Sequence, residues 1–311
     1  MNLLMNNIQQ IIRDDKKNIS YLIYYSMIEA ILLMVSPLTS AFIINSVLAH
    51  ATVSIGVLGF IVIVVFMIIA LIQVLKAYMV EKFEQRIFVK NAIDISKLAV
   101  NDKAQRDDQT VDKYMNYFFD VIAIQKLFPS LLLNGTGLVV KLVVSLILLL
   151  VFDFSFFMLG IFFIVFFLFF VLLLGRKGAG FAVERSDAKH EAIYYLQDIP
   201  SEKKSRDEIL KELDTRLIRF VETRQRMFSV VVKQLGLTYF MEGLVLSSFF
   251  IMGGYLVFEG DVPIGEFVAA EIIIIYVIYA LKDFMKQIDY MYEAIEGFYK
   301  LNKLSSVLEN K

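Results

Sequence analysis

The sequence predicts an all-α membrane protein with six long transmembrane helices and helical extensions on the cytoplasmic side. Hydrophobic residues make up 58% of the 311 residues, and the mean hydropathy is +0.65, both above the range of a soluble domain. The 31 Lys and Arg residues avoid three short stretches, 49–54, 153–155 and 258–264. Because translocated loops exclude Lys and Arg while cytoplasmic loops collect them, these stretches are predicted to be outside turns, with both termini in the cytoplasm.

Six apolar runs are long enough to cross a bilayer core, which takes about 20 helical residues. The first contains Pro37, which a membrane helix tolerates when its neighbours satisfy the freed carbonyl. Only Asp153 separates the third run from the fourth, so these two are predicted to form a tight antiparallel pair. The runs are continuous and not alternating, which favours helices over a β-barrel. The predicted transmembrane helices are 19–48, 55–78, 130–152, 154–174, 235–258 and 264–281.

The charged regions 79–129 and 175–234 are predicted to be helical hairpins that project into the cytoplasm. In both, apolar residues recur at helical spacing, with charged residues on the other side. Polar stretches at 101–110 (NDKAQRDDQT) and 198–207 (DIPSEKKSRD) mark the breaks between the two helices of each hairpin. The alternative is a pair of small separate domains or flexible loops, which the helical phasing argues against.

Composition excludes several classes of function. There is no cysteine and there are only two histidines, His50 and His190, far apart in the predicted topology. We therefore expect no metal site in this chain. The net charge of −1 gives no basic field for nucleic acid, so no nucleic-acid partner is expected. The N-terminal residues lack the order of a cleavable signal peptide, and the first helix is expected to remain as an anchor.

Four ionisable residues fall inside predicted membrane helices, namely Glu29, Lys141, Glu242 and Glu271. Such residues are costly in a bilayer and face a bundle interior or a wet cavity. Glu29, Lys141 and Glu242 lie at similar predicted depths, so Lys141 is expected to pair with Glu29 or with Glu242. The four residues either line a translocation cavity or form structural ion pairs, and both roles stay open.

Two uncharged polar residues, Gln73 and Asn45, are weaker candidates for the same lining. The many phenylalanines of 154–174 occupy every face of that helix. This distribution favours lipid contact and helix packing over an aromatic cage for a substrate.

Three short motifs resemble the membrane domain of ABC transporters of the exporter type. The first is Pro37 followed by IINSVL at 43–48, and the second is the very short turn FDFS at 152–155. The third and most specific is GGYLVFEGDVPIGEFVAA at 253–270, a Gly-rich outer turn followed by the start of the sixth helix. The segment AIEGFYKL at 294–301 then resembles the helix that leads to an ATPase domain in that family.

The resemblance implies the type I exporter fold and a dimer of membrane subunits, homomeric or heteromeric, in the cell (inner) membrane. In that family the hairpin tips are coupling helices that dock on ATP-binding cassette subunits. By resemblance, the tips are 101–110 and 199–206, and the second hairpin reaches across to the partner's ATPase. The coupling residues implied are Gln105, Arg106, Asp107, Ile199, Pro200, Ser201, Glu202 and Lys203.

The chain departs from the family because it has no GxxxxGK[ST] phosphate loop. The closest cluster, GRKGAG at 175–180, lacks the Lys-Ser/Thr pair and is interpreted as a flexible basic segment at the membrane boundary. We therefore expect no catalytic residue and no bound cofactor in this chain, with ATP and Mg²⁺ held by a separate ATPase subunit. Two alternatives stay open: a regulatory or receptor protein that has lost the ATPase, and the membrane half of a fused exporter. The sequence does not choose among lipids, amphipathic peptides and hydrophobic cations as substrates.

Overall fold

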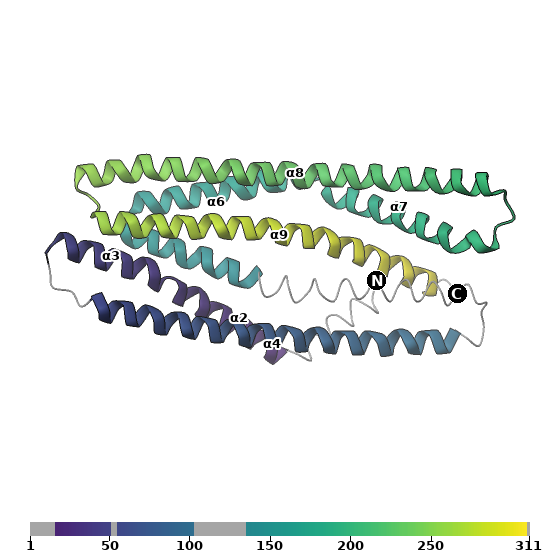
Figure 1. The fold of residues 1–311 in the computed structure, drawn as a ribbon, viewed down its shortest axis with the longest axis horizontal. Helices are drawn as coiled ribbons and strands as arrows, with labels where there is room; N and C mark the ends of the chain where they lie inside the picture. Colours follow the sequence, from purple (N-terminus) through teal and green to yellow (C-terminus); the bar gives the residue numbers. More distant parts are fainter. Residues whose placement is uncertain (1–15, 51–54, 103–134, 310–311) are drawn as a thin grey trace.

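The computed structural model describes residues 16–50, 55–102 and 135–309, all of which belong to helices or to short turns between them. Six helical stretches in this part of the chain are long and apolar enough to cross a membrane, as in a multi-pass membrane protein. The molecule is an elongated bundle (Figure 1). One end, here called the turn end, carries the short connections at Asp153 and 260–263; the opposite end, here called the hairpin end, carries the connection between α7 and α8.

The first apolar run consists of two helices, α2 (Lys16–Leu33) and α3 (Val35–Leu48), with a turn at Met34. The cause is Pro37, which lacks a backbone N–H and whose ring collides with the carbonyl of the residue four positions earlier. That residue is Leu33, where α2 ends. The sequence predicted one continuous helix over this run, and the structure replaces it with a helix broken one turn before the proline.

Three helices continue far beyond their apolar parts. Helix α4 (Ile55–Asp102) has 48 residues, α8 (Arg206–Glu259) has 54 and α9 (Ile264–Glu309) has 46. At 1.5 Å per residue these lengths correspond to roughly 70–80 Å, against about 30 Å for a bilayer core. The remaining helices are the segment Gly135–Phe152, α6 (Phe154–Gly175) and α7 (Gly178–Asp198), with the short 3₁₀ helix η1 (Ile199–Ser201).

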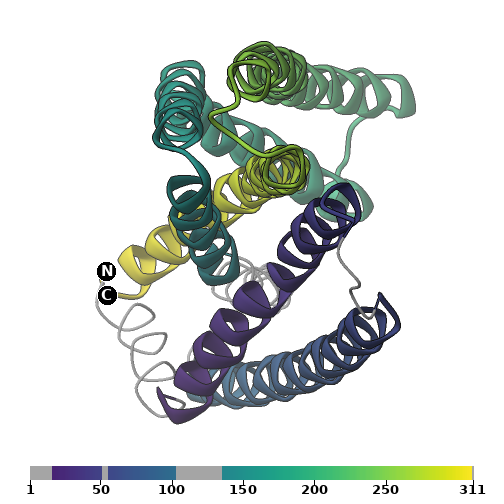
Figure 2. The same cartoon turned by 90° about the vertical axis from the view of Figure 1, so that its left-hand side faces the viewer.

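Helix α9 lies at the centre of the bundle. It packs against α3 on one side and against α6, α7 and α8 on the other, as the view along the long axis shows (Figure 2). Its buried face near the turn end includes Ala270, Ile273 and Ile274, none of which is exposed to solvent. Helix α2 packs on α4, which forms the outer wall on the far side of α3.

Aromatic rings fill the core near the turn end. The Phe249 ring of α8 stacks on the Phe267 ring of α9 with 5.4 Å between centroids, and it also contacts Phe156 of α6 at 5.0 Å. Other phenylalanines of α6, such as Phe162 and Phe169, are exposed on the surface. The phenylalanines of α6 therefore divide between helix packing and the exposed apolar face, as expected for a helix in contact with lipid.

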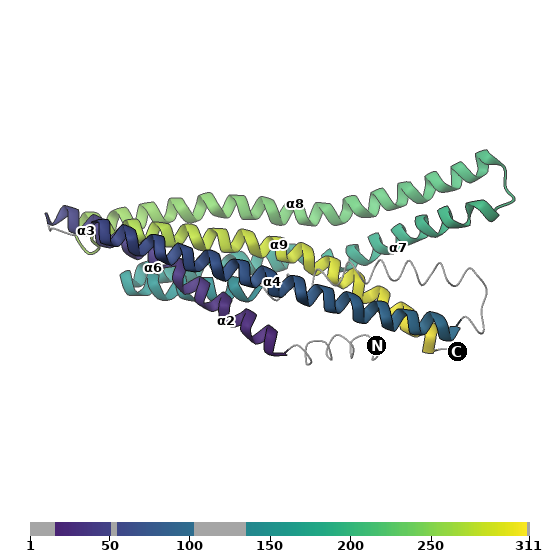
Figure 3. The ribbon, with the colours of Figure 1, turned by 60° about the horizontal axis from the view of Figure 1, so that its bottom comes forward.

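At the hairpin end, α7 and α8 lean away from α4 and α9 (Figures 1 and 3). Helices α7 and α8 stay packed against each other along this projection. The break expected at 198–207 coincides with η1 and the turn that precedes Arg206. Helix α4 reaches Asp102 within the first expected break, and the rest of that tip, with Gln105, Arg106 and Asp107, lies outside the described residues.

The bundle makes a testable prediction of membrane sidedness. Because the chain has no cysteine, single cysteines introduced at Asp261 in the turn end and at Ser201 in the hairpin end can be labelled without background. We expect a membrane-impermeant maleimide to react with only one of them in intact cells and with both after permeabilisation. Equal labelling of both positions in intact cells would contradict a bundle that crosses the membrane.

Candidate functional site

A cavity of about 280 Å³ opens among four helices. Its residues lie toward the hairpin end of the apolar runs; Lys76 and Ala280, for example, are near the ends of the runs 55–78 and 264–281. Most of the lining residues are polar or charged, and the others are small or aliphatic. The lining residues are Ser26, Glu29, Ala30 and Leu33 of α2, Lys76 of α4, Gly137, Leu138 and Lys141 of the helix Gly135–Phe152, and Ala280, Asp283, Lys286, Gln287 and Tyr290 of α9.

Glu29 is held by two residues of α4. Lys76 Nζ lies 2.6 Å from Glu29 Oε2, and Gln73 Nε2 donates a hydrogen bond of 2.9 Å to Glu29 Oε1. Both side chains of the ion pair are largely buried, with 17% and 15% exposed. Gln73 and Lys76 are three residues apart and therefore share one face of α4, which lets one carboxylate accept from both. This interaction fixes α2 against α4 beside the cavity.

The expected pairing of Lys141 was wrong. Lys141 lines the cavity near enough to Glu29 for electrostatic attraction, but it forms no ion pair with a described residue. Glu242 of α8 pairs instead with Lys282 of α9 at 2.7 Å, and neither residue lines the cavity. The sequence placed the carboxylates at a suitable depth, but it did not show that α4 and α9 each supply a closer lysine.

Asn45 and Glu271 lie outside the cavity. The Asn45 side chain accepts a hydrogen bond of 2.9 Å from the backbone N–H of Gly265, in the first turn of α9, whose amides have no partner within the helix. Asn45 thus caps α9 from the neighbouring helix α3, a structural role. Glu271 is half-buried in α9 and is not among the residues that line the cavity.

The glycine-rich segment at 175–180 forms a compact joint between α6 and α7. The Tyr292 side chain of α9 is buried against this joint, and its hydroxyl donates to the Gly175 carbonyl at 3.4 Å. The buried Gln234 of α8 donates to the Val171 carbonyl at 3.0 Å and to the Tyr292 hydroxyl at 3.4 Å. A Cβ at Gly178 would lie 2.4 Å from the Tyr292 ring. The segment therefore packs closely against two helices, α8 and α9, and its interpretation as a flexible boundary segment is replaced by a packed joint.

A second contact ties α9 to the base of the α7–α8 hairpin. Arg185 of α7 forms an ion pair of 2.6 Å with Glu296 of α9, and Lys189 lies 3.9 Å from the same carboxylate. The Glu296 side chain is only 9% exposed. Helix α9 also carries cavity residues, so the same helix contacts both the hairpin and the cavity.

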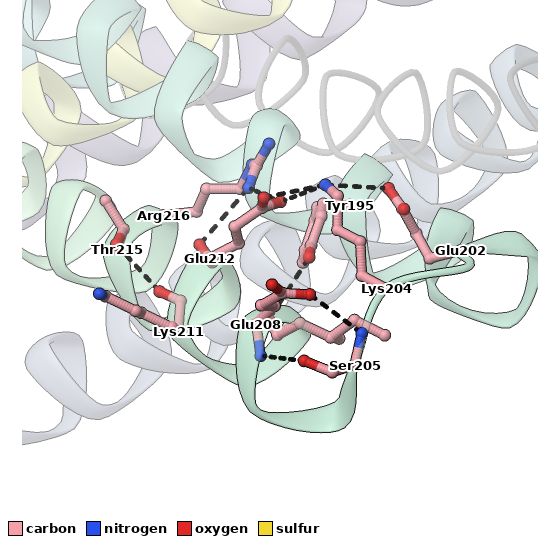
Figure 4. Close-up of polar contacts among 10 residues, drawn as sticks. Tyr195, Glu202, Lys204, Ser205, Glu208, Lys211, Glu212, Thr215 and Arg216 are labelled. Atoms are coloured by element: carbon pink, nitrogen blue, oxygen red, sulfur yellow. Dashed lines mark hydrogen bonds and ion pairs between the residues drawn. The ribbon is translucent and has the colours of Figure 1, made fainter.

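Side chains of α7 and α8 contact each other at the tip of the hairpin (Figure 4). Lys204 lies between two carboxylates, 2.8 Å from Glu212 and 3.6 Å from Glu202. The buried Tyr195 ring stacks under the Arg216 guanidinium at 4.0 Å. These contacts join α7, α8 and the turn between them.

A capping box defines the start of α8. The Ser205 hydroxyl accepts from the backbone N–H of Glu208, and the Glu208 carboxylate accepts from the backbone N–H of Ser205. This reciprocal pair satisfies two amides that the helix leaves free. Of the expected coupling residues, Ile199, Pro200 and Ser201 form η1, while Glu202 and Lys203 follow it. They lie together in the turn between α7 and the capping box of α8.

The tip has a predictable pH dependence. The hydrogen bond from Lys204 lowers the pKa of Glu212, and the same contact raises the pKa of Lys204. Burial, and then the neighbouring Glu212, raise the pKa of the Tyr195 hydroxyl. A lowered acid pKa contributes stability that is present above the ordinary carboxylate pKa and is lost as pH falls through the folded value. The raised pKa values of Lys204 and Tyr195 contribute stability that is lost only as pH rises through theirs.

We therefore expect the backbone amides of 195–216 to be best protected from hydrogen exchange at pH values between those at which Glu212 and Lys204 titrate. After correction for intrinsic exchange, protection should fall as pH decreases below about 4.5, the ordinary carboxylate pKa. In Glu212→Gln this acid-side loss should disappear, and protection at neutral pH should already be low. An acid-side loss of equal size in Glu212→Gln would show that another group controls the tip.

No protein-family model and no curated protein matches this chain. Within the ranges 16–50, 55–102 and 135–309, no group of three or more His, Cys, Asp or Glu is placed to hold a metal ion. Functional assignment therefore depends on the cavity and on the hairpin tip.

Proposed function

We propose that this chain is the membrane-spanning subunit of an ATP-driven exporter of the ABC type, in which two membrane subunits form the pathway and a separate ATPase supplies the energy. The observation that carries the proposal is the α7–α8 hairpin, which extends well past the apolar helix α6 and the apolar part of α8. Its tip is charged and exposed, and it carries an ion pair between Lys204 and Glu212 and a capping box at the start of α8. These properties suit a docking surface through which a second protein moves the membrane helices.

The remaining parts of the proposal follow from the same scheme. The protein lies in the cell (inner) membrane with both termini and the hairpin end in the cytoplasm. Binding and hydrolysis of ATP with Mg²⁺ take place on the partner. Closure of the partner moves the tip, and two contacts with α9 carry this movement to the cavity: the ion pair of Arg185 with Glu296 and the hydrogen bond from Tyr292 to Gly175. Export is the direction that the resemblance to exporters implies.

A pull-down of the tagged chain in mild detergent from its own host tests the proposal, with co-purifying proteins and ATPase activity recorded. We expect a stoichiometric ATPase that is lost from Lys203→Glu, an exposed tip residue. Arg224→Glu, the same charge reversal at an exposed site elsewhere on α8, should retain it. Loss from both variants alike would contradict docking at the tip.

A regulatory or receptor role is the second candidate, because an anchored hairpin can also report ligand binding to another protein without ATP. A clean dimer that carries no ATPase would favour this role and would end the transport proposal. A reading frame that continues past residue 311 into a phosphate-loop sequence would instead favour the membrane half of a fused exporter, with the same role for the tip.

A further inference from the structure

Two buried polar atoms in the wall of the cavity have no hydrogen-bond partner among the described residues. They are the Ser26 hydroxyl oxygen and Gln287 Oε1, on side chains of residues that are 1% and 6% exposed. A buried polar atom without a partner costs about 1–3 kcal/mol, so native structures rarely keep one without a reason. Ser26 and Gln287 both line the same 280 Å³ cavity, so both atoms lie in its wall, where a small rotation of either side chain would bring a ligand within hydrogen-bond reach.

The charges of the cavity specify the sign of that ligand. Three lysines and two carboxylates line it. Lys76 pairs with Glu29 at 2.6 Å, and Lys286 pairs with Asp283 at 3.0 Å. Lys141 is the remaining cation, half-buried and without an ion pair to a described residue. With three lysines and two carboxylates the lining has an excess of one positive charge, and an anion beside Lys141 would balance it.

The uncharged groups specify a second property. Gln287 Oε1 is an acceptor only, so its partner must donate an O–H or N–H. The Ser26 hydroxyl can donate or accept. A ligand that satisfies the wall therefore carries one negative group for Lys141 and at least one donor for Gln287. The volume, equivalent to about nine waters at ~30 Å³ each, admits a headgroup-sized molecule and excludes a folded peptide.

We propose that this cavity binds a monoanionic group that carries a hydroxyl donor, as in a phosphoglycerol headgroup. Lysine binds phosphate as a point charge, and the hydroxyl donates to Gln287. The cavity lies where the apolar runs end, which is the depth at which headgroups begin in a bilayer. The group can belong to a lipid or to a free solute. Its assignment as cargo rests on the proposed function, but its binding does not. Hydrophobic cations, which the sequence left open as substrates, do not match a wall with an unpaired lysine.

Binding to the purified full chain in neutral detergent tests the proposal. The probes are short-chain phosphatidylglycerol, its deacylated headgroup glycerophosphoglycerol, and short-chain phosphatidylcholine, which is zwitterionic and lacks the hydroxyl. We expect saturable binding of phosphatidylglycerol, measured by calorimetry, and at least ten-fold weaker binding of phosphatidylcholine. Comparable affinity of glycerophosphoglycerol would identify a solute as the source, and binding of the acylated form alone would identify a lipid. Absence of binding by both anionic probes overturns the proposal.

Variants separate the cavity from nonspecific charge attraction. Lys141→Gln should weaken phosphatidylglycerol binding about ten-fold or more, because hydrogen bonds to charged groups are strong. Lys233→Gln, the same charge change at an exposed residue of α8 that does not line the cavity, should bind as the unmodified chain does. An equal loss in both variants overturns the proposal, since it would mean that surface charge alone attracts the lipid.

Ser26→Ala provides a test that a purely structural role would fail. The alanine removes a buried hydroxyl that lacks a partner, so the unliganded protein should unfold at the same temperature or a higher one. The same variant should bind phosphatidylglycerol several-fold more weakly. A variant that loses thermal stability while keeping full affinity would show that the hydroxyl supports the fold and not the ligand. Neither measurement involves an ATPase, so failure here is distinct from failure of the exporter proposal.

Discussion

Among substitutions of the described glycines by alanine, Gly265→Ala is expected to lower the free energy of unfolding the most. A Cβ at this position would lie 2.3 Å from Asn45 Oδ1 and 2.6 Å from the backbone oxygen of Ala41. The second contact is with the main chain of α3, which cannot rotate away. The helices α3 and α9 must therefore separate, and the hydrogen bond from the Gly265 N–H to Asn45 is lost. Overpacking of this kind costs typically 1–3 kcal/mol and occasionally more; we expect about 3 kcal/mol.

The measurement is unfolding of Gly265→Ala in mild detergent, followed by circular dichroism in denaturant. Gly254→Ala is a matched control, because a Cβ there meets nothing within 4 Å and alanine is the better helix former. The double variant Asn45→Ala/Gly265→Ala should remain unstable, since the Ala41 oxygen stays in place. Full recovery in that double variant would show that the side chain of Asn45, and not the backbone of α3, sets the distance between the helices.

The sequence predicted an all-helical protein with six long apolar helices because this signal is strong in the chain. A long apolar run with few charges has few structures available in a bilayer. The break at 198–207 was readable for a similar reason, since Pro200 and a cluster of polar residues cannot continue a helix easily. The signal that was missed here is local: Ser205 and Glu208 have the spacing of a capping box, which marks the start of α8.

The candidate site was predicted only in part. Glu29 and Lys141 line the cavity, as the cost of burying them suggested. Lys76 was missed because it lies at the end of an apolar run, where a lysine is usually a boundary residue. The three-residue spacing of Gln73 and Lys76 could have indicated that they share a partner.

Contacts between segments far apart in the sequence could not be predicted from residue type alone. Asn45 is a polar residue within an apolar run, as a cavity residue would be, but its side chain contacts Gly265. Only the packing of α3 on α9 reveals this contact. Ser26 and Gln287 carry no charge and no motif. Their importance depends on being buried without partners beside one cavity, a property that only the folded structure defines.

Substitution of Gly178 by alanine is the second prediction with a large expected effect. The added Cβ would lie 2.4 Å from the ring of Tyr292. The ring is buried and its hydroxyl is shared with Gln234 and the Gly175 carbonyl, so it cannot turn away without losing both contacts. We expect a loss of about 1–3 kcal/mol in unfolding free energy, measured as for Gly265→Ala.

This clash differs from the one at Gly265. The three atoms nearest to a Cβ at Gly178 all belong to the Tyr292 side chain, whereas a Cβ at Gly265 also meets a backbone atom. Tyr292→Leu shortens that side chain and should itself destabilise the joint, since it removes the hydroxyl that Gln234 and Gly175 contact. In the Tyr292→Leu background, however, Gly178→Ala should cost little, giving a coupling of roughly 1–3 kcal/mol between the two sites. Additive losses would instead mean that the backbone of the joint requires glycine. Coupling would show that α9 holds the base of the hairpin through the fit of one ring against one glycine.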